Sequence, residues 1–441
     1  MLENFYSYKI DGMTANPLKF YGFLNFGPQR FTENRLCGKL TDHMEISSGG
    51  TAVTIFNRLL AAVKYIVKKA DMVLLGLCLV CTAFGIVLIA SATAYRGTSY
   101  QLRRVIIQTA GAVMGIGAYF ILSNVDVEHF SEKWGLFFVF NLGFIALLWK
   151  FGVGGETTGN QAWLAIPHFP VQIQPAEVVK LSFTVLLAKQ MAWFRDNRGM
   201  KGLGSLVFPA AHAGLMFVWI YFFSHDAGSG LVYLVIYAGM ALAAGLAWYW
   251  FVIGIGGLGV AVGLLAVFEK LPGYWVRRFQ VLFDHSYDPL GTGLQQTRGM
   301  LALGSGGLFG QGLFQGIQTQ GAQGSLPARQ TDFIFCVCGE ELGMAGCLAV
   351  IALEFLLVYR CFQTARLAKS SMDALICVGF ATMLIFQTVE NIGMCLFVMP
   401  VIGLTLPFFS YGGSSILTLY AALGIVSGVR SRTLPDWLRK T

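Results

Sequence analysis

The stretch MVLLGLCLVCTAFGIVLIASATAY, residues 72–95, runs for 24 residues without a charged side chain. An α-helix rises about 1.5 Å per residue, so about 20 apolar residues suffice to cross a hydrocarbon core about 30 Å thick. A helix that is apolar on all sides is buried, either in lipid or in the core of a large protein. The length of this stretch favours lipid, and it predicts a transmembrane helix.

Similar apolar runs follow along the chain. The uncharged run from Ala227 to Phe268 has 42 residues, too many for one span. Trp248, Tyr249 and Trp250 near its middle are typical of an interfacial aromatic belt, so the run is divided there. About ten spans are thus predicted, at 72–95, 105–125, 134–152, 177–194, 204–224, 228–247, 248–268, 332–359, 373–399 and 411–429.

The composition agrees with an all-α polytopic membrane protein. Of the 441 residues 55% are hydrophobic and only 12% are charged, and the mean hydropathy is +0.62. A soluble domain carries about a quarter charged residues, so this chain could not cover its surface in water. Its formal net charge of +8 lies in short clusters between apolar runs and not on one stripe. We therefore expect membrane lipids, and no nucleic acid, as partners.

The basic clusters predict the orientation, because loops rich in Lys and Arg stay on the cytoplasmic side. Such clusters precede the first predicted span, follow the fourth and the eighth, and end the chain. Their members are Arg58, Lys64, Lys68, Lys69, Arg195, Arg198, Lys201, Arg360, Arg366, Lys369, Arg430, Arg432, Arg439 and Lys440. Both termini are therefore predicted to be cytoplasmic, and the long loop 269–331, between predicted helices seven and eight, extracytoplasmic.

Three regions are expected. Residues 1–65 lack a 20-residue apolar run and the basic-then-apolar start of a signal peptide, which predicts a partly disordered cytoplasmic tail. Residues 66–430 form the membrane domain, and 431–441 a second cytoplasmic tail. Translation could begin at Met1 or at Met44, and the sequence leaves that choice open.

Ionisable residues at membrane depth cost about 2.5–3.5 kcal/mol each on insertion scales, so each is a functional hypothesis. They are Glu177, Lys180, Lys189, Asp226, Asp332, Glu340, Glu341, Glu354 and Glu390. Glu177 and Lys180 stand three residues apart and share a helix face, which predicts an ion pair that is either structural or functional. Glu340 and Glu341 either line a proton path or flank a kink, and we favour the kink.

Two further sequence patterns do not predict a catalytic or metal site. The glycine-rich run GSGGLFGQGLFQG (304–316) lacks the Lys-Ser/Thr of a phosphate-binding loop, so its glycines are expected to let a loop and a short helix pack closely. The cysteines lack the partners of a zinc site and are expected to pack as small hydrophobic residues. No metal site is predicted from residue spacing.

Three blocks of the sequence resemble those of a known family. IQPAEVVK (173–180), TDFIFCVCGEELG (331–343) and NIGMCLFVMPVIGLTLPFFSYGGSS (391–415) are similar to signature blocks of the SEDS family (shape, elongation, division and sporulation), to which RodA, FtsW and SpoVE belong. The resemblance covers about residues 66–430. It implies a peptidoglycan glycosyltransferase of the bacterial cytoplasmic membrane, which polymerises lipid II into glycan strands on the outer face beside a class B penicillin-binding protein.

The resemblance also implies a site. The essential aspartate of the family falls on Asp332, which we assign as the general base toward the acceptor's GlcNAc 4-hydroxyl, with a pKa raised by desolvation. Cations are expected to hold the departing pyrophosphate, and a divalent cation (Mg or Mn) would suit that task without a visible ligand set. The expected substrate-binding residues are Arg104, Trp163, Glu177, Lys180, Arg277, Gln295, Ser410 and Ser414.

Several residues depart from the family pattern. GNQAWLAI (159–166) keeps Trp163 but lacks the usual arginine, Arg298 replaces a glutamine, and Ala328 stands where glutamate is common. These changes put the substrate contacts of the outer loop in doubt but leave Asp332 untouched. GSGG at 304–307 favours RodA over FtsW.

Two other functions are compatible with the same residues. A lipid II flippase would use the buried charges as a pathway and would need no general base. A non-catalytic scaffold would only recruit the transpeptidase, and its outer loop would tolerate change. The role in elongation, division or sporulation is left open.

Overall fold

A computed structural model describes residues 69–154, 160–165, 172–200, 202–267, 273–284, 293–321 and 325–433. The predicted tail 1–65 lies outside these residues, as do Lys201 and residues 434–441, so the three-region division stays a prediction. The described chain is mostly helical, with one antiparallel pair of two-residue strands, which confirms the predicted fold class.

The described elements follow the predicted runs closely. In chain order they are α2 (Met72–Ala94), α3 (Thr98–Asn124), α4 (Val127–Glu132), α5 (Trp134–Ala146), α6 (Leu148–Phe151), β1 (Gly152–Val153), β2 (Trp163–Leu164), α8 (Pro175–Asn197), α9 (Leu203–Ser224), α10 (Ala227–Ala244), α11 (Trp248–Val267), α12 (Gly273–Phe283), α13 (Leu294–Ser305), α14 (Ile317–Gln320), α15 (Ile334–Leu367), α16 (Ser371–Cys395) and α17 (Gly413–Thr433).

Within this part of the chain, eight helical segments are long and apolar enough to cross a membrane: α2, α3, α5 with α6, α9, α10, α15, α16 and α17. Helices α8 and α11 coincide with the other two predicted spans but are not among these eight. Helix α8 carries five charged residues, at positions 177, 180, 189, 195 and 196. A multi-pass protein is confirmed, whereas the count of ten and the side of the termini stay predictions.

The long uncharged run breaks where the aromatic residues predicted. Helix α10 ends at Ala244, and Gly245 caps it in the left-handed region with a φ of 92°. Helix α11 begins at Trp248. In the predicted outer loop, by contrast, a short helix was expected beside the glycine-rich run, but the bounds of α12, α13 and α14 were not predicted, because short helices need no long apolar run.

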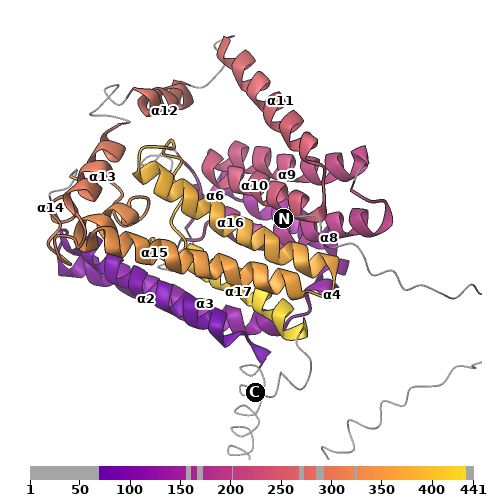
Figure 1. The fold of residues 1–441 in the computed structure, drawn as a ribbon, viewed down its shortest axis with the longest axis horizontal. Helices are drawn as coiled ribbons and strands as arrows, with labels where there is room; N and C mark the ends of the chain where they lie inside the picture. The colour runs from indigo at the N-terminus through magenta and orange to yellow at the C-terminus, as the bar shows by residue number, and fades with distance from the viewer. Residues whose placement is uncertain are drawn as a thin grey trace, which may run out of the picture. The chain divides into compact units, whose positions relative to one another are not determined.

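The helices pack in two connected groups (Figure 1). Helices α2, α3, α15, α16 and α17 lie side by side, and α8 and α10 join α16 to α9. Helices α3 and α17 approach closely through small residues, as is usual in membranes. A side chain at Gly424 would meet the backbone of Tyr119 at 2.7 Å, so only glycine permits this contact.

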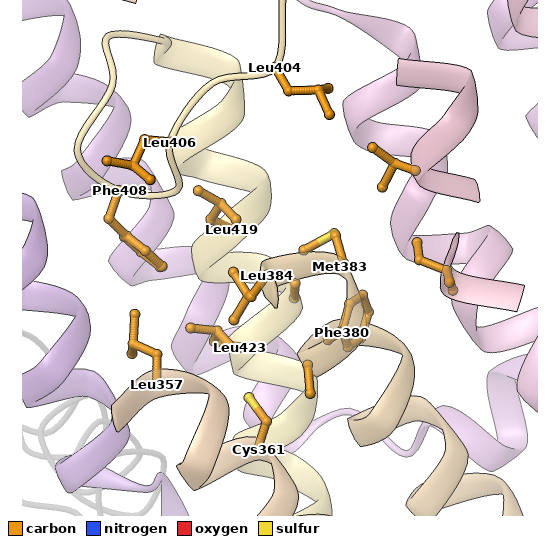
Figure 2. Close-up of a cluster of buried hydrophobic side chains, with 14 of the residues drawn as sticks. Leu357, Cys361, Phe380, Met383, Leu384, Leu404, Leu406, Phe408, Leu419 and Leu423 are labelled. Carbon is orange, nitrogen blue, oxygen red and sulfur yellow. The ribbon is translucent and has the colours of Figure 1, made fainter. Parts of the chain in front are cut away.

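The core lies between α15, α16, α17 and the segment 396–412, which joins α16 to α17 (Figure 2). The segment inserts Leu404, Leu406 and Phe408 toward the helices. The helices contribute Leu357, Cys361, Phe380, Met383, Leu384, Leu419 and Leu423. The eight described cysteines are free and buried, as expected of small hydrophobic residues. This core holds the connecting segment firmly against the helices.

Helix α15 is kinked at Gly343, whose φ of 67° and ψ of −163° are not helical. The kink frees backbone groups that must find partners, and the glycine-rich segment supplies them. The bonds run from Gln311 N to Glu340 O (2.9 Å), Gly312 N to Glu341 O (3.0 Å), Met344 N to Gly307 O (2.9 Å) and Ala345 N to Leu308 O (3.1 Å). Both expectations, a kink beside the two glutamates and close packing of the glycines, are confirmed.

The side chains of Glu340 and Glu341 hold the same segment. The Glu340 carboxylate accepts the backbone N–H of Gln318 at 2.6 Å and of Thr319 at 2.8 Å, in the first turn of α14. Glu341 Oε1 accepts the hydroxyl of Ser91 on α2 at 2.7 Å. These bonds give the two carboxylates a structural task at the kink.

Candidate active site

Asp332 lies in a tight turn immediately before α15. The backbone N–H groups of Thr331, Asp332 and Phe333 all donate to Ala328 O, at 3.1, 3.1 and 3.2 Å. Ala328 has a φ of 49°, a conformation uncommon for residues other than glycine. The N-cap of α15 is Phe333, and no side chain caps the helix. The Asp332 carboxylate is therefore not engaged as a helix cap.

The end of α16 and the segment after it fix this turn from the other side. Asn391 Nδ2 donates to Asp332 O at 2.9 Å and to Leu404 O at 2.8 Å. Ser410 Oγ donates to Thr331 O at 2.6 Å and accepts the N–H of Leu406 at 2.9 Å. Two of the three family-like blocks thus meet at Asp332 through bonds that set the backbone.

The surroundings of Asp332 shift its proton affinity. Burial raises the pKa of Asp332 to about 6, while the Thr331 hydroxyl and the Arg278 guanidinium counteract the rise and Asp226 adds to it. Burial disfavours the charged carboxylate, and a neighbouring cation favours it. At neutral pH Asp332 is thus mostly ionised yet more basic than an ordinary aspartate. The expected direction of its pKa is confirmed.

Arg104 borders the same connecting segment from α3. Its guanidinium stacks on the rings of Tyr100 and Tyr411, with centroid distances of 4.9 and 4.7 Å. One turn later Gln108 donates to Ser410 O at 3.2 Å and accepts the N–H of Gly412 at 3.0 Å. The same short segment therefore ties Arg104 and Asp332 to one region of the protein.

Glu177 and Lys180 form the predicted ion pair in the first turns of α8. Lys180 Nζ lies 2.6 Å from Glu177 Oε1, and the side chains are 2% and 8% exposed. Thr418 on α17 lies 3.5 Å from Glu177 Oε2. The pairing is observed, whereas a role of either residue in binding substrate stays a prediction.

Asp226 lies within electrostatic range of both the ion pair and Asp332. Its carboxylate caps α10 by accepting Ser229 N at 3.0 Å and also accepts Gln174 Nε2 at 3.2 Å. Burial raises its pKa, and both Glu177 and Lys180 act on it electrostatically. Because Asp226 also acts on Asp332, the polar residues before α8, α10 and α15 belong to one cluster.

The other predicted residues are placed less centrally. Trp163 is half-buried in β2, opposite Val153, and Gln295 is half-buried in α13. Ser414 is buried in the first turn of α17, and its hydroxyl has no hydrogen-bond partner among the described residues. Arg277 is exposed on α12, whereas its neighbour Arg278 donates to Val401 O and acts on Asp332. No described contact joins Trp163, Gln295 or Arg277 to Asp332.

Sequence reasoning did not give Gln174, Asn391 or Arg278 a place at this site. Gln174 and Asn391 lie inside blocks already singled out, so their amides could have been proposed as bracing groups. Arg278 could not be preferred over Arg277 as the arginine near Asp332, because that choice depends on how α12 is rotated about its own axis. Glu390 on α16, noted only as an ionisable residue, lies within electrostatic range of Asp332 and Arg278.

The described residues offer no preformed protein site for a divalent cation. No group of three His, Cys, Asp or Glu side chains converges among them so as to hold a metal ion. We therefore derive no step through a metal, and the cationic side chains carry the electrostatic argument.

The fold and the site together define a polytopic helical membrane protein with a polar cluster gathered where α8, α10 and α15 begin. The chain belongs to the family of cell cycle proteins that comprises FtsW, RodA and SpoVE, whose model matches residues 71–433. It is accordingly a multi-pass membrane protein of bacteria, as predicted. The match does not distinguish RodA from FtsW, so the favoured RodA likeness stays a prediction.

Individual relatives support the assignment to this family. The chain is 30% identical over 378 residues to a probable peptidoglycan glycosyltransferase FtsW of Geobacter sp. (strain M18), covering 83% of this chain and 98% of that one. It is 32% identical over 371 residues to the stage V sporulation protein E of Bacillus subtilis (strain 168), covering 81% and 96%.

Solved structures share the fold. A chain of a peptidoglycan synthase complex superposes with a TM-score of 0.70 at 28% identity, covering 83% of this chain and 99% of that chain. The rod shape determining protein RodA of Thermus thermophilus gives a TM-score of 0.58 at 27% identity, covering 83% of this chain and 98% of that chain.

Proposed function

We propose that this protein is a peptidoglycan glycosyltransferase that polymerises lipid II into glycan strands, with Asp332 as its general base. The observation that carries the proposal is the turn that holds Asp332. Its carboxylate does not cap α15, and its pKa is raised by burial near Arg278. Hydrogen bonds from Asn391 and Ser410 fix the backbone of the turn. Membership in a family whose relatives are named peptidoglycan glycosyltransferases supports the reaction class.

The reaction is a displacement at a sugar anomeric carbon. The acceptor's GlcNAc 4-hydroxyl attacks the carbon, the new glycosidic C–O bond forms, and the bond to the undecaprenyl pyrophosphate breaks. Asp332 takes the hydroxyl proton, and the pyrophosphate leaves with the bonding electrons. A carboxylate with a pKa of about 6 is ionised at neutral pH and is a stronger base than an unperturbed aspartate.

The departing pyrophosphate needs positive charge that is already in place. Arg104 borders the segment that braces the Asp332 turn, and Arg278 acts directly on Asp332. Arg104 is held between two tyrosine rings, so its guanidinium is oriented before substrate arrives. We assign both arginines to the pyrophosphate, together with Lys180 and Arg277 as the resemblance implies.

The same resemblance implies a class B penicillin-binding protein as partner. The synthase complex with the same fold combines polymerisation and crosslinking, which supports an assembly of this kind. We propose that the partner crosslinks the strands that this chain extends.

The test is purified full-length protein, alone and with its transpeptidase, incubated with lipid II, with the products separated on a gel. Asp332→Asn is expected to lower the rate by about 10²–10⁴-fold, because the amide cannot accept the proton. Asp284→Asn, the same change at an exposed residue after α12, is the matched control and is expected to polymerise normally.

The outcomes separate the alternatives. A flippase would translocate lipid II, and neither the unmodified protein nor Asp332→Asn would form glycan strands. A scaffold would form strands only when its partner supplies the polymerase, and Asp332→Asn would not matter. Polymerisation by Asp332→Asn at the rate of the unmodified protein would refute the general-base assignment.

A further inference from the structure

A cavity lies at the other end of α15, remote from Asp332. It has a volume of about 540 Å³, within the usual range of ligand sites. Four helices line it: the end of α8, the end of α10, the end of α15 and the start of α16. The 24 residues of α15 after its kink at Gly343 span about 36 Å, so the cavity and Asp332 lie near opposite ends of a helix long enough to cross a membrane.

Two arginines line this cavity, Arg195 from α8 and Arg366 from α15, together with the amide side chain of Gln363. Gln363 Oε1 accepts a bond from Arg360 at 3.1 Å, which orients the amide. The N–H groups of that amide remain as donors. Two guanidinium groups and an amide suit a phosphate oxygen better than any neutral group.

Neither lining arginine has a carboxylate within ion-pair distance among the described residues. Two acidic side chains nearby are already paired with other arginines. Asp71 pairs with Arg360 at 2.9 Å and with Arg430 at 3.3 Å. Asp373 pairs with Arg432 at 3.3 Å, and Asp196 accepts a bond from Ser371 at 3.0 Å. Asp196 keeps its charge but does not line the cavity, whose lining contains two arginines and no acidic residue and is therefore net positive.

The remaining walls are apolar and continue onto the flank of the helices. Phe362 and Val378 line the cavity beside the small side chain of Ala243. Leu242, next to Ala243, is 58% exposed, and Tyr359, which also lines the cavity, is 50% exposed. A ligand with an anionic end and a hydrocarbon end matches this arrangement.

We propose that this cavity is a binding site for an anionic phospholipid, with the headgroup phosphate on Arg195 and Arg366 and an acyl chain along Ala243 and Phe362. Basic pockets between membrane helices on the cytoplasmic side bind such headgroups. The basic clusters of this chain predict that the cavity faces that side, where the membrane surface is anionic. A soluble phosphate ester shares the headgroup chemistry but would gain nothing from the apolar flank.

The test is native mass spectrometry of the full-length protein in detergent, titrated with phosphatidylglycerol, cardiolipin or phosphatidylcholine. The unmodified protein is expected to retain the two anionic lipids in preference to phosphatidylcholine. The double variant Arg195→Gln/Arg366→Gln is expected to bind them at least about tenfold more weakly, because two charge-assisted bonds are lost. Ala243→Leu, which fills the cavity without removing charge, is expected to weaken them as well.

The matched control removes the same charge from the same end of the protein. It is Arg198→Gln/Lys369→Gln, two residues that do not line the cavity, and it is expected to bind as the unmodified protein does. An equal loss in the control, or equal binding of phosphatidylcholine, would show that the lipid only surrounds the protein and would overturn the proposal. Displacement of the lipid by equimolar glycerol phosphate would overturn it in favour of a soluble phosphate ligand.

Discussion

Lys180→Ala tests how far the buried ion pair of α8 supports the fold. The substitution removes an ammonium that lies 2.6 Å from Glu177 Oε1, where the two side chains are 2% and 8% exposed. The carboxylate would keep only the hydroxyl of Thr418, 3.5 Å away. Removing one partner of a buried pair costs about 3–5 kcal/mol, because the other charge stays buried without compensation. We expect a loss of that size in the free energy of unfolding.

The assay is unfolding of the purified protein by SDS in mixed micelles, followed by circular dichroism, which measures folding without depending on activity. Lys133→Ala, in the exposed turn between α4 and α5, is the control and is expected to change stability by less than about 0.5 kcal/mol. The double variant Glu177→Gln/Lys180→Met is expected to recover most of the loss, since a buried pair can often be replaced without cost. A Lys180→Ala protein as stable as Lys133→Ala would refute the argument.

Three further predictions follow from the site and the kink. Polymerisation is expected to fall as the pH drops from about 7 to about 5, because protonation of Asp332 through its pKa of about 6 removes the base; a rate that stays level across this range would contradict the assignment. Gly343→Ala is expected to lower the free energy of unfolding by about 1–3 kcal/mol, because a φ of 67° strains alanine and its methyl group would meet the backbone of Leu308 and Gly310. The control in the same unfolding assay is Gly76→Ala on α2. An added methyl group there would have no neighbour within 4 Å, so this change is expected to be neutral or stabilising. Gln108→Ala removes both bonds to the segment before α17 and is expected to cost about 1–3 kcal/mol and to slow polymerisation, and normal rates on the lipid II gel would show that the segment does not need this brace.

The sequence predicted the membrane helices because the signal for a span is strong and local. An uncharged run of about 20 residues has one stable outcome in a bilayer, and a Trp-Tyr-Trp cluster marks a boundary by the same physics. The Glu177–Lys180 pair was equally accessible, since three residues of helix bring two charges onto one face. For Glu340 and Glu341 a kink was favoured over a proton path, and α15 bends at Gly343.

The contents of the outer loop were not accessible in this way. Helix α14 has four residues and is held by Glu340, which lies 20 residues beyond its last residue, Gln320. Its stability comes from that distant contact and not from its own sequence. The choice between Arg277 and Arg278 depends on the rotation of α12. Likewise, the net positive lining around Arg195 and Arg366 emerges only when Asp71 and Asp373 are seen to be engaged elsewhere.

The kink in α15 has a consequence for how this helix forms. Only the 24 residues after Gly343 form a continuous hydrogen-bonded rod long enough to cross the bilayer. Residues 334–342 have free backbone groups that the glycine-rich segment completes, and that segment precedes them in the chain. The first part of α15 can therefore satisfy its backbone only once the glycine-rich segment lies beside it, so the helix start next to Asp332 depends on a tertiary contact and not on helix formation alone.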